Sequence, residues 1–351
     1  MKNKTIITLF AFCLYYGQPH EALSQDENSY QVACVGFYNL ENLFDTIYDP
    51  SLVANEEFTP DAAKQWTHQR YHEKLSNMAY VISKIATDVT PDGPCLLGVS
   101  EIENRSVLED LVLKDDIKDR DYHIVHYDSP DRRGVDVALL YQPKYFKVLN
   151  TASHTLIREE DTSWRTRDQL VVTGLLLGEE VSIIVNHWPS RSGGEKASRP
   201  KRNAAGQLSR YIVDSLLAIN PQAKIFVMGD LNDDPVNPSV LEYLRAKGKE
   251  KELEKGDLFN PYYKLYKEGI GSLAYRDIWN LFDMVILSQG LLGKPSDDFR
   301  FYKAMVFNKN FLKQKEGQYK GYPHRTFGGS VYLGGYSDHF PVYVFVIRKS
   351  K

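Results

Sequence analysis

The chain has 351 residues, of which 42% are hydrophobic, so it holds enough apolar material for a large buried core. That length fits one large domain or two small ones. The formal charge of −3 and the pI near 6.3 exclude overall basic charge as the means of binding a polyanion. Any such substrate must be met by a local basic patch.

The first residues have the pattern of a targeting segment. A basic start precedes the apolar run TIITLFAFCLYY, and a polar stretch ending in ALSQ follows it. We expect residues 1–24 to be a secretory signal peptide cleaved after Ser24, which leaves residues 25–351 as the mature domain. The run is too short for a transmembrane helix. Lipidation at Cys13 is the alternative, but Phe12 stands where a small residue is needed. The expected product is a secreted or periplasmic monomer without a stable membrane anchor.

Two cysteines remain after such a cleavage. Cys34 and Cys95 each lie inside an apolar run, QVACVGFY and CLLGVS, that reads as a buried strand. This placement favours two small core residues over a disulfide, although the pairing stays open. A cysteine cluster of the zinc-binding type is not present in the sequence.

The rest of the chain alternates strand-like and helix-like patterns without a repeat or a linker, which indicates one α/β domain. Apolar residues with helical spacing predict helices within residues 74–89 and 199–220. The charged stretch from about 243 to 275 is weakly periodic, and we interpret it as a surface excursion. Many of the strand-like runs are continuously apolar, as strands buried on both faces would be. The runs are QVACVGFY, CLLGVS, YHIVHY, VDVALLY, QLVVTGLLL, VSIIVNH, AKIFVMG, FDMVILS and VYVFVIR.

Polar clusters stand at the ends of several of these runs. They are FYNLENLFD, GVSEIEN, VNHWPSR and VMGDLNDDP after a strand, and YSDHFPV before the last strand. Strand ends at one edge of a sheet are where α/β proteins gather binding residues. Carboxylates and carboxamides with few thiols or imidazoles provide hard oxygen ligands, which suit Mg²⁺, Mn²⁺ or Ca²⁺ rather than zinc.

The motifs NLEN, SEIEN, RRGVDVALLY, NHWPSR, GDLNDDP, WNLFDMVILS and GGYSDHFPV occur in this order between about residues 31 and 347. In wording and order they resemble the endonuclease/exonuclease/phosphatase superfamily of metal-dependent phosphoesterases. The resemblance covers nearly the whole mature chain. It implies a four-layer α/β sandwich, with two packed mixed sheets flanked by helices and a catalytic site at one end.

The same resemblance implies a metal site made of oxygen ligands. Asn39 and Glu101 match the family's metal-site pair, and Asp338 matches a carboxylate that approaches the ion from the last strand. Glu41 occupies a position where many members carry an acidic residue. A carboxylate beside a carboxamide is a sensible oxygen set for Mg²⁺, with Mn²⁺ or Ca²⁺ as alternatives.

Five residues match the catalytic positions of the family. His339 and Asp283 match a histidine and the carboxylate that orients it, so that the imidazole acts as a base or stabilises the transition state. Asp230 and Asn232 match the pair that lies against the attacking water and the phosphate. The neutral amide can donate to a phosphoryl oxygen without adding negative charge. His187 matches a residue that donates to the scissile phosphate.

Other polar residues near these motifs have less defined roles. Arg133, Arg191 and Ser190 are the expected substrate-binding residues, because arginines suit a phosphate-rich groove. Ser190 departs from the Asn that some members carry. Asp233 and Asp234 read as a capped turn before Pro235. Further candidates for the groove are Asp136, Arg165, Arg167, Lys201, Arg202 and Arg276.

Three functions remain compatible with these residues. The first is an exported, metal-dependent nuclease that hydrolyses DNA or RNA. The second is a phosphatase or phospholipase acting on phosphoinositides, sphingomyelin or other phosphate esters, because the same catalytic set serves those members. The third is a catalytically silent binding protein on the same fold, against which the complete set of motif residues argues. Fold and catalytic residues alone do not choose between the first two.

Overall fold

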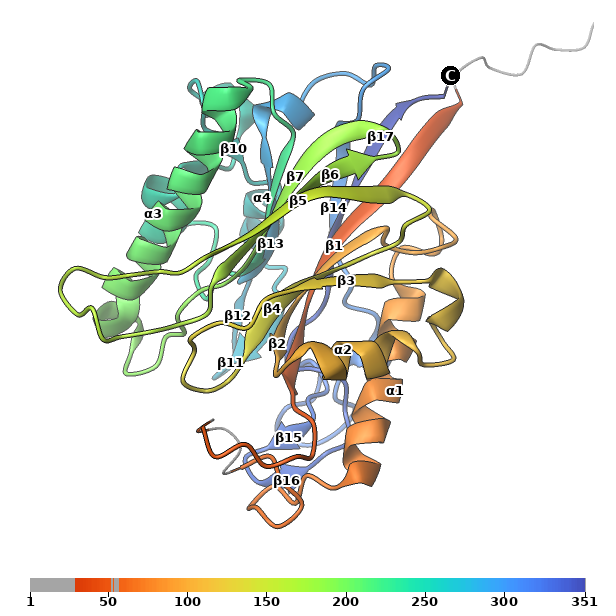
Figure 1. The fold of residues 1–351 in the computed structure, drawn as a ribbon, viewed down its shortest axis with the longest axis vertical. Coiled ribbons are helices and arrows are strands. Elements are labelled where there is room, and N and C mark those ends of the chain that lie inside the picture. Colours follow the sequence, from red (N-terminus) through yellow and green to blue (C-terminus); the bar gives the residue numbers. More distant parts are fainter. Residues whose placement is uncertain (1–28, 52, 54–56, 351) are drawn as a thin grey trace, which may run out of the picture.

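Two large sheets form the centre of the molecule in a computed structural model, which describes residues 29–51, 53 and 57–350 (Figure 1). The first sheet runs in the order β14, β17, β1, β2, β4 and β3. β1 lies parallel to β2 and antiparallel to β17, so the end of β1 meets the start of β17. The strands of this sheet are β1 (Tyr30–Leu43), β2 (Leu96–Ile102), β3 (His123–His126), β4 (Asp136–Tyr141), β14 (Arg300–Val306) and β17 (Val342–Lys349).

The second sheet packs against the first and runs in the order β5, β6, β7, β8, β13, β10 and β9. β7 and β8 are parallel, and β13 is antiparallel to β8. The ends of β7 and β8 therefore meet the start of β13. The strands are β5 (Phe146–His154), β6 (Gln169–Leu176), β7 (Glu179–His187), β8 (Ile225–Asp230), β9 (Ala246–Lys247), β10 (Leu258–Phe259) and β13 (Asp283–Ser288).

Helices cover the outer faces of the two sheets. α1 and α2 lie against the first sheet, and the long α3 lies against the second (Figure 1). The expected four-layer α/β sandwich is therefore confirmed. The helices of four or more residues with α geometry are α1 (His68–Lys84), α2 (Arg105–Val112), α3 (Glu195–Ile219) and α4 (Tyr262–Lys267).

α1 begins earlier than the apolar pattern of residues 74–89 predicts. The Thr67 side chain accepts a hydrogen bond from the Arg70 backbone N–H and caps the helix, so the first turn forms although it is polar. The helix ends at Lys84, and Ala86 then takes a left-handed φ of 60°. A polar cap sets the first end and a change of backbone conformation sets the second, and hydrophobic periodicity reveals neither.

The inner faces of the sheets are apolar and closely packed. All residues of β8 and β13 are buried, as their continuous apolar runs predict. Gly98 lies where a Cβ would come within 2.6 Å of the Met228 sulfur on the facing sheet, so the two sheets approach too closely for a side chain there. Cys34 and Cys95 are buried, unbonded core residues, and the Cys95 thiol donates to the Cys34 carbonyl at 3.2 Å.

The interpretation of residues 243 to 275 as a surface excursion is wrong for much of that stretch. β9 and β10 extend the second sheet, and the side chains of Leu258 and Tyr262 are fully buried. The Tyr262 hydroxyl donates to the Tyr343 carbonyl in the first sheet at 3.0 Å. Very short strands carry too few residues to show a period, so the sequence pattern missed them.

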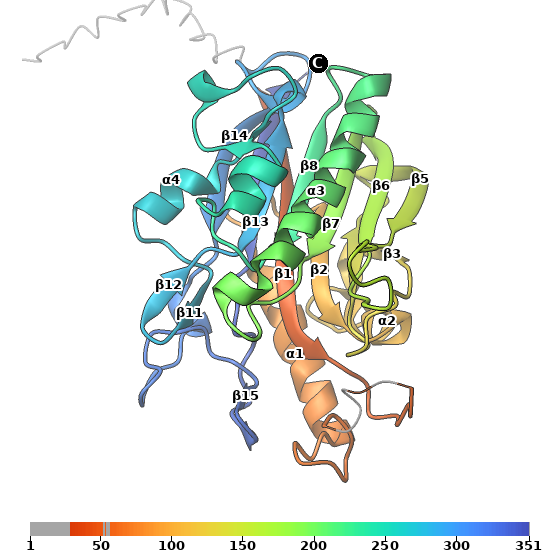
Figure 2. The same cartoon turned by 90° about the vertical axis from the view of Figure 1, so that its left-hand side faces the viewer.

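Two small hairpins lie at the end of the molecule where β1 ends (Figure 2). They are β11 (Leu273–Tyr275) with β12 (Ile278–Asn280), and β15 (Phe327–Gly328) with β16 (Val331–Tyr332). The proposed signal peptide, residues 1–24, lies outside the described residues. Among the residues that are described, no helix combines the length and the apolar character needed to cross a bilayer.

Candidate active site

Six of the sequence-predicted site residues meet at one end of the two sheets. The pairing of the strands explains this, because β1, β2, β7 and β8 end where β13 and β17 begin. Asp230 at the end of β8 stands in register with His187 on one side and Asp283 on the other. Asn39, Glu101 and His339 approach from the first sheet. The site is therefore shared between the sheets.

Asp230 is the centre of this arrangement. Its Oδ2 accepts a hydrogen bond from Asn39 Nδ2 at 3.1 Å and lies 3.7 Å from His187 Nε2 and 3.9 Å from His339 Nε2. Burial raises the pKa of Asp230 to about 7, opposed by the charge of His339 and reinforced by the negative charge of Asp283. The Asp230 carboxylate can therefore accept a proton, and a nearby cation would stabilise its negative charge.

His339 is paired with a buried carboxylate. Its Nδ1 lies 2.7 Å from Asp283 Oδ2, and the Ser272 hydroxyl donates to the same oxygen. Burial disfavours the charged imidazole, but the negative charges of Asp283 and Asp230 prevail and raise the pKa of His339 well above its ordinary value. His339 is therefore cationic at neutral pH, with Nε2 directed to the centre of the site.

The pKa of His187 is shifted in the opposite direction. The side chain is buried, and this burial together with the charges of Arg167 and Arg133 lowers the pKa of His187 well below its ordinary value. Its Nε2 lies 3.7 Å from both Glu101 Oε1 and Asp230 Oδ2. A neutral imidazole can donate one hydrogen bond to a phosphate without adding charge.

Asn232 follows Asp230 through a left-handed backbone turn with a φ of 51°. The Asn232 backbone N–H donates to Asp230 Oδ1 at 2.9 Å, and its side-chain Nδ2 donates to the Trp188 carbonyl at 3.0 Å. These two bonds fix the turn and the amide plane. An amide nitrogen carries two hydrogens, so one remains to donate to a substrate oxygen.

Glu101 and Asp338 present carboxylate oxygens to the same region. Glu101 has a left-handed φ of 58°, and its Oε2 accepts the Asn42 backbone N–H at 3.0 Å while Oε1 faces His187. Asp338 Oδ2 accepts a hydrogen bond from Arg325 Nη2 at 2.8 Å. Burial opposes ionisation of Asp338, but His339 and Arg325 lower the pKa below its usual range, so the group is ionised.

The oxygen donors fit a divalent cation of the Mg²⁺ type. Glu101 and Asp338 supply carboxylate oxygens, and Asn39 Oδ1 accepts the Glu41 N–H at 2.9 Å, which leaves a second lone pair on that oxygen. Hard oxygen ligands of this kind suit Mg²⁺, Mn²⁺ or Ca²⁺. One possible ligand atom from each of Asp230, Asp283 and His339, a carboxylate oxygen or an imidazole nitrogen, also lies within 4.8 Å of the other two.

Glu41 departs from the expected metal-ligand arrangement. Its Oε2 accepts the Thr326 backbone N–H at 2.7 Å and lies 3.7 Å from the Lys74 ammonium, and Arg325 Nε lies 3.4 Å from Oε1. Burial and the neighbouring Asp338 raise the pKa of Glu41. Lys74 and Arg325 therefore already neutralise the Glu41 carboxylate. Glu41 contacts the residues around the site and does not face its centre.

The sequence matches the model of the Endonuclease/Exonuclease/phosphatase family over residues 34–348. The chain belongs to this family. The match spans all of the site residues described above, and no curated protein matches the sequence significantly. The resemblance inferred from the motifs is confirmed.

Three solved structures illustrate the family fold. An endonuclease/exonuclease/phosphatase family protein from Bacteroides thetaiotaomicron has a TM-score of 0.54 at 15% identity, covering 92% of this chain and 97% of that protein. The mannosyl-6-phosphatase Bt3783 from Bacteroides thetaiotaomicron has a TM-score of 0.53 at 15% identity, covering 90% and 99%. D. rerio TDP2, complexed with single strand DNA product, has a TM-score of 0.51 at 13% identity, covering 90% and 98%. These likenesses show the fold alone.

The three residues predicted to bind substrate differ in how accessible they are. Arg133 is exposed beside the site, with its guanidinium 4.0 Å from Glu101 Oε1 and 2.5 Å from Asn42 Oδ1. Ser190 is exposed on the loop after β7. Arg191 is committed to the protein itself, because it donates to Asp233 and Asp234 and stacks on Phe282, with its centre 4.4 Å from the ring.

Asp233 and Asp234 have larger structural roles than the turn predicted for them. Asp233 Oδ2 forms an ion pair with Arg202, 2.7 Å from its Nε, and both side chains are buried, so Arg202 is not part of an exposed basic rim. Asp234 Oδ1 accepts the Leu281 backbone N–H at 2.8 Å. The two carboxylates therefore tie the loop after β8 to the start of α3 and to the segment before β13.

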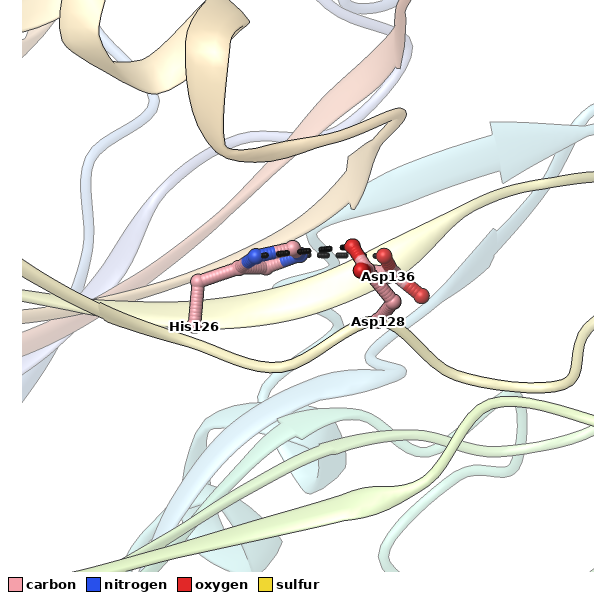
Figure 3. Close-up of side chains that lie close together, drawn as sticks. All are labelled: His126, Asp128 and Asp136. Atoms are coloured by element: carbon pink, nitrogen blue, oxygen red, sulfur yellow. Dashed lines mark hydrogen bonds and ion pairs between the residues drawn. The ribbon is translucent and has the colours of Figure 1, made fainter.

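A second histidine and carboxylate group lies near the end of β3 (Figure 3). His126 Nε2 is 2.9 Å from Asp136 Oδ2, and Asp128 lies 3.9 Å from His126 Nδ1. Asp136 Oδ1 also accepts from the backbone N–H and the hydroxyl of Ser129. The protein's own donors thus satisfy Asp136, which anchors the loop between β3 and β4 and does not line the groove as predicted.

Three residues of the site region have roles that the motifs did not show. Arg167 is buried and donates to the carbonyls of His187 and Trp188 and to Asp131, so it fixes the end of β7 instead of lining a groove. Lys74 and Arg325 surround Glu41. Lys74 lies on a helix and Arg325 on a loop, and neither stands beside a recognisable strand-end motif.

Proposed function

We propose that the protein is a divalent-metal-dependent phosphodiesterase that hydrolyses nucleic acid. One observation carries the catalytic part of this proposal. A neutral His187 and a cationic His339 flank one buried carboxylate, Asp230, next to the oxygen donors of Asn39 and Glu101. This set can activate water and stabilise a phosphorane-like transition state.

Each side chain has a defined task in this scheme. Asp230 aligns the attacking water and accepts its proton, because its Oδ2 lies at the centre of the site beside both histidines. His339, held charged by Asp283, stabilises the negative charge that develops on the phosphoryl oxygens. His187 and Asn232 donate hydrogen bonds to those oxygens. A cation bound by Glu101, Asn39 and Asp338 would supply Lewis-acid polarisation of the phosphate.

The choice of nucleic acid rests on the arginines beside the site. Arg133, on the loop before β4, is 45% exposed near Glu101. Arg325, on the loop before β15, is 44% exposed while it contacts Asp338 and Glu41, whereas Arg191 is only 23% exposed. Arg133 and Arg325 approach from different segments, as a substrate with several phosphates would require, whereas a monoester offers one. The fold itself does not choose, since a phosphatase and a DNA-bound enzyme share it. We also propose export, supported by the signal-like pattern of residues 1–24.

A substrate panel tests the proposed function directly. Purified protein with Mg²⁺ is incubated with plasmid, linear duplex DNA, single-stranded DNA, RNA, phosphomonoesters, and inositol and choline phospholipids. We expect cleavage of DNA or RNA. Intact plasmid, oligonucleotides and RNA under conditions where a phosphomonoester or phospholipid is hydrolysed would assign the protein to the phosphatase or phospholipase class.

We expect activity to depend on a divalent cation. Excess chelator should abolish hydrolysis, and added Mg²⁺ or Mn²⁺ should restore it, because the proposed ligands are hard oxygens. The Glu101→Gln variant should need more Mg²⁺ for half-maximal rate, measured by metal titration of initial rates. Full activity of the wild type in excess chelator would contradict the metal assignment.

We expect Arg133→Ala to weaken nucleic-acid binding in a salt-dependent manner. Loss of one phosphate contact should reduce the slope of log affinity against log salt by about 1. The measurement is fluorescence anisotropy with a labelled oligonucleotide in Ca²⁺ at several salt concentrations. Arg132→Ala is the matched control, because Arg132 is the exposed neighbour on the same loop. If Arg132→Ala and Arg133→Ala changed the slope equally, the specific contact between Arg133 and a phosphate would be contradicted.

A further inference from the structure

A cavity of about 690 Å³ opens beside the catalytic site. Arg325 and Asp338 line it at the catalytic end, and Arg276, Tyr275, Tyr319 and Tyr322 line it farther out. Its volume is within the range of sites that enclose a small molecule. Its walls come from the β11–β12 hairpin and from the loops around β15, which lie together in Figure 2. None of the catalytic roles assigned above uses these outer residues.

The hairpin wall is joined directly to the catalytic pair. Ser272, just before β11, donates through its hydroxyl to Asp283, and its carbonyl accepts the Phe340 backbone N–H at 2.7 Å. Phe340 follows His339 in the chain. The cavity is thus held in a fixed position relative to the His339–Asp283 pair, as a binding site for part of the substrate requires.

The tip of the hairpin is held in a strained conformation. Arg276 and Asp277 have left-handed φ angles of 50° and 63°, although neither is glycine or asparagine. The Tyr322 hydroxyl accepts the Asp277 backbone N–H at 2.7 Å and lies 2.6 Å from Asp277 Oδ1, so the opposite wall fixes the tip. Strain maintained by surrounding contacts is concentrated at binding sites. Here it presents the Arg276 side chain, whose guanidinium lies 5.2 Å from the Tyr275 ring centre.

Aromatic rings continue from the catalytic end toward the cavity. Phe340 stacks on Trp279 at 6.0 Å with an interplanar angle of 16°, Trp279 lies 6.0 Å from Tyr322, and Tyr322 lies 5.7 Å from Tyr319. Tyr319 is 48% exposed, so the outermost ring has a face available. Rings interleaved with arginines are the surface on which unpaired nucleobases stack while their phosphates are neutralised.

We propose that this cavity binds an unpaired nucleotide next to the scissile phosphate, with its base against Tyr319 and Tyr322 and its phosphate against Arg276. This inference rests on the proposed nuclease function and specifies the substrate as single-stranded or frayed nucleic acid. A base inside a duplex has its faces covered by its neighbours and its edge paired, so it cannot enter such a cavity without being extruded.

Two substrates with the same leaving group test the cavity. One is the p-nitrophenyl ester of thymidine 5′-phosphate, which carries a nucleoside, and the other is ethyl p-nitrophenyl phosphate, which does not. Tyr319→Ala should lower kcat/KM about tenfold for the nucleoside ester and for single-stranded oligonucleotides. Arg276→Ala should do so for the oligonucleotides, because only they carry a second phosphate beside the scissile one. Rates with the ethyl ester should change by less than about twofold, because the catalytic residues are untouched.

Controls separate this effect from a general loss of structure or charge. Tyr211→Ala and Arg105→Ala remove an exposed tyrosine and a half-exposed arginine elsewhere and should leave all rates unchanged. Binding of a labelled hexathymidylate in Ca²⁺, followed by anisotropy, gives a second measurement that is independent of turnover. The wild type should bind it more tightly than a blunt duplex of equal length, and Tyr319→Ala should reduce that difference.

The outcomes distinguish this inference from the proposed function. Cleavage of nucleic acid with unchanged kinetics in Tyr319→Ala and Arg276→Ala would overturn the cavity assignment alone. Equal losses on the nucleoside ester and the ethyl ester would also overturn it. If the wild type hydrolyses a hexose 6-phosphate and no nucleic acid, and the variants impair that reaction, both proposals fail and the cavity binds a sugar.

Discussion

Asp230→Asn and His339→Ala should each lower kcat by on the order of 10³-fold or more while the protein stays folded. The first change removes the proton acceptor at the centre of the site, and the second removes the cation that faces Asp230 Oδ2 at 3.9 Å. Single-turnover kinetics with saturating enzyme, together with thermal melting curves, measure both the chemical step and the fold.

A conservative change on the surface provides the comparison. Asp115→Asn replaces an exposed aspartate that pairs with Lys118 and should leave kcat unchanged. Asp283→Asn should fall between these results, because His339 would keep its position but lose the carboxylate that holds its charge. If Asp230→Asn retained near-normal turnover with a native melting curve, the role of the GDLND motif assigned here would be wrong.

Arg202→Ala should destabilise the protein by about 3 to 5 kcal/mol, since removing one partner of a buried ion pair leaves an uncompensated charge. Arg202 is fully buried, and its Nε lies 2.7 Å from Asp233 Oδ2 in an ion pair. Its guanidinium also donates to the carbonyls of Ser190 and Glu195. The free energy of unfolding from urea titration, with an unchanged m-value, measures the effect.

The same helix supplies the control for this prediction. Arg199→Ala removes an arginine that is 41% exposed and whose partner, Glu195, is one helical turn away. Surface pairs of this kind contribute little, so the change in stability should be within about 0.5 kcal/mol. Equal destabilisation by the two variants would show that the buried pair with Asp233 has no special weight.

The large elements of the fold were predictable because their patterns are long. Nine apolar runs correspond to β1, β2, β3, β4, β6, β7, β8, β13 and β17, and both long helices were expected. β9 and β10 were not, since each has two residues and depends on its neighbours in the sheet rather than on its own period. β5 and β14 were missed because polar residues interrupt both of them.

Some features of the candidate site were likewise predictable from the sequence, and others were not. Asn39, Glu101, His187 and Asp230 lie at or near the ends of their strands, so the strand-end motifs predicted that they meet at one edge of the sheets. The direction in which a side chain points depends on tertiary contacts. Arg133 is exposed at the site, whereas Arg191 is paired with Asp233 and Asp234. Local sequence gives both arginines the same appearance.

The built-in cations near Glu41 could not be predicted at all. Lys74 reaches Glu41 from α1, and its ammonium donates to Thr326 Oγ1 at 2.7 Å, across more than 250 residues of chain. Burial lowers the pKa of Lys74 to about 8, which shows how strongly the environment acts on it. A lysine on an amphipathic helix is ordinarily solvated, and only the three-dimensional arrangement identifies this one as internal.

The hydrogen bond from Asn39 to Asp230 joins the two sheets at the catalytic centre, while Gly98 and Met228 set how closely those sheets approach in the core. A change in the volume of the core residues between the sheets should therefore shift Asn39 relative to Asp230, although those core residues lie far from the site. An exchange that adds or removes a core methyl group would then alter the geometry of the site while every side chain in the site is retained. The interior of the sandwich would therefore constrain the geometry of the site as well as the stability of the fold.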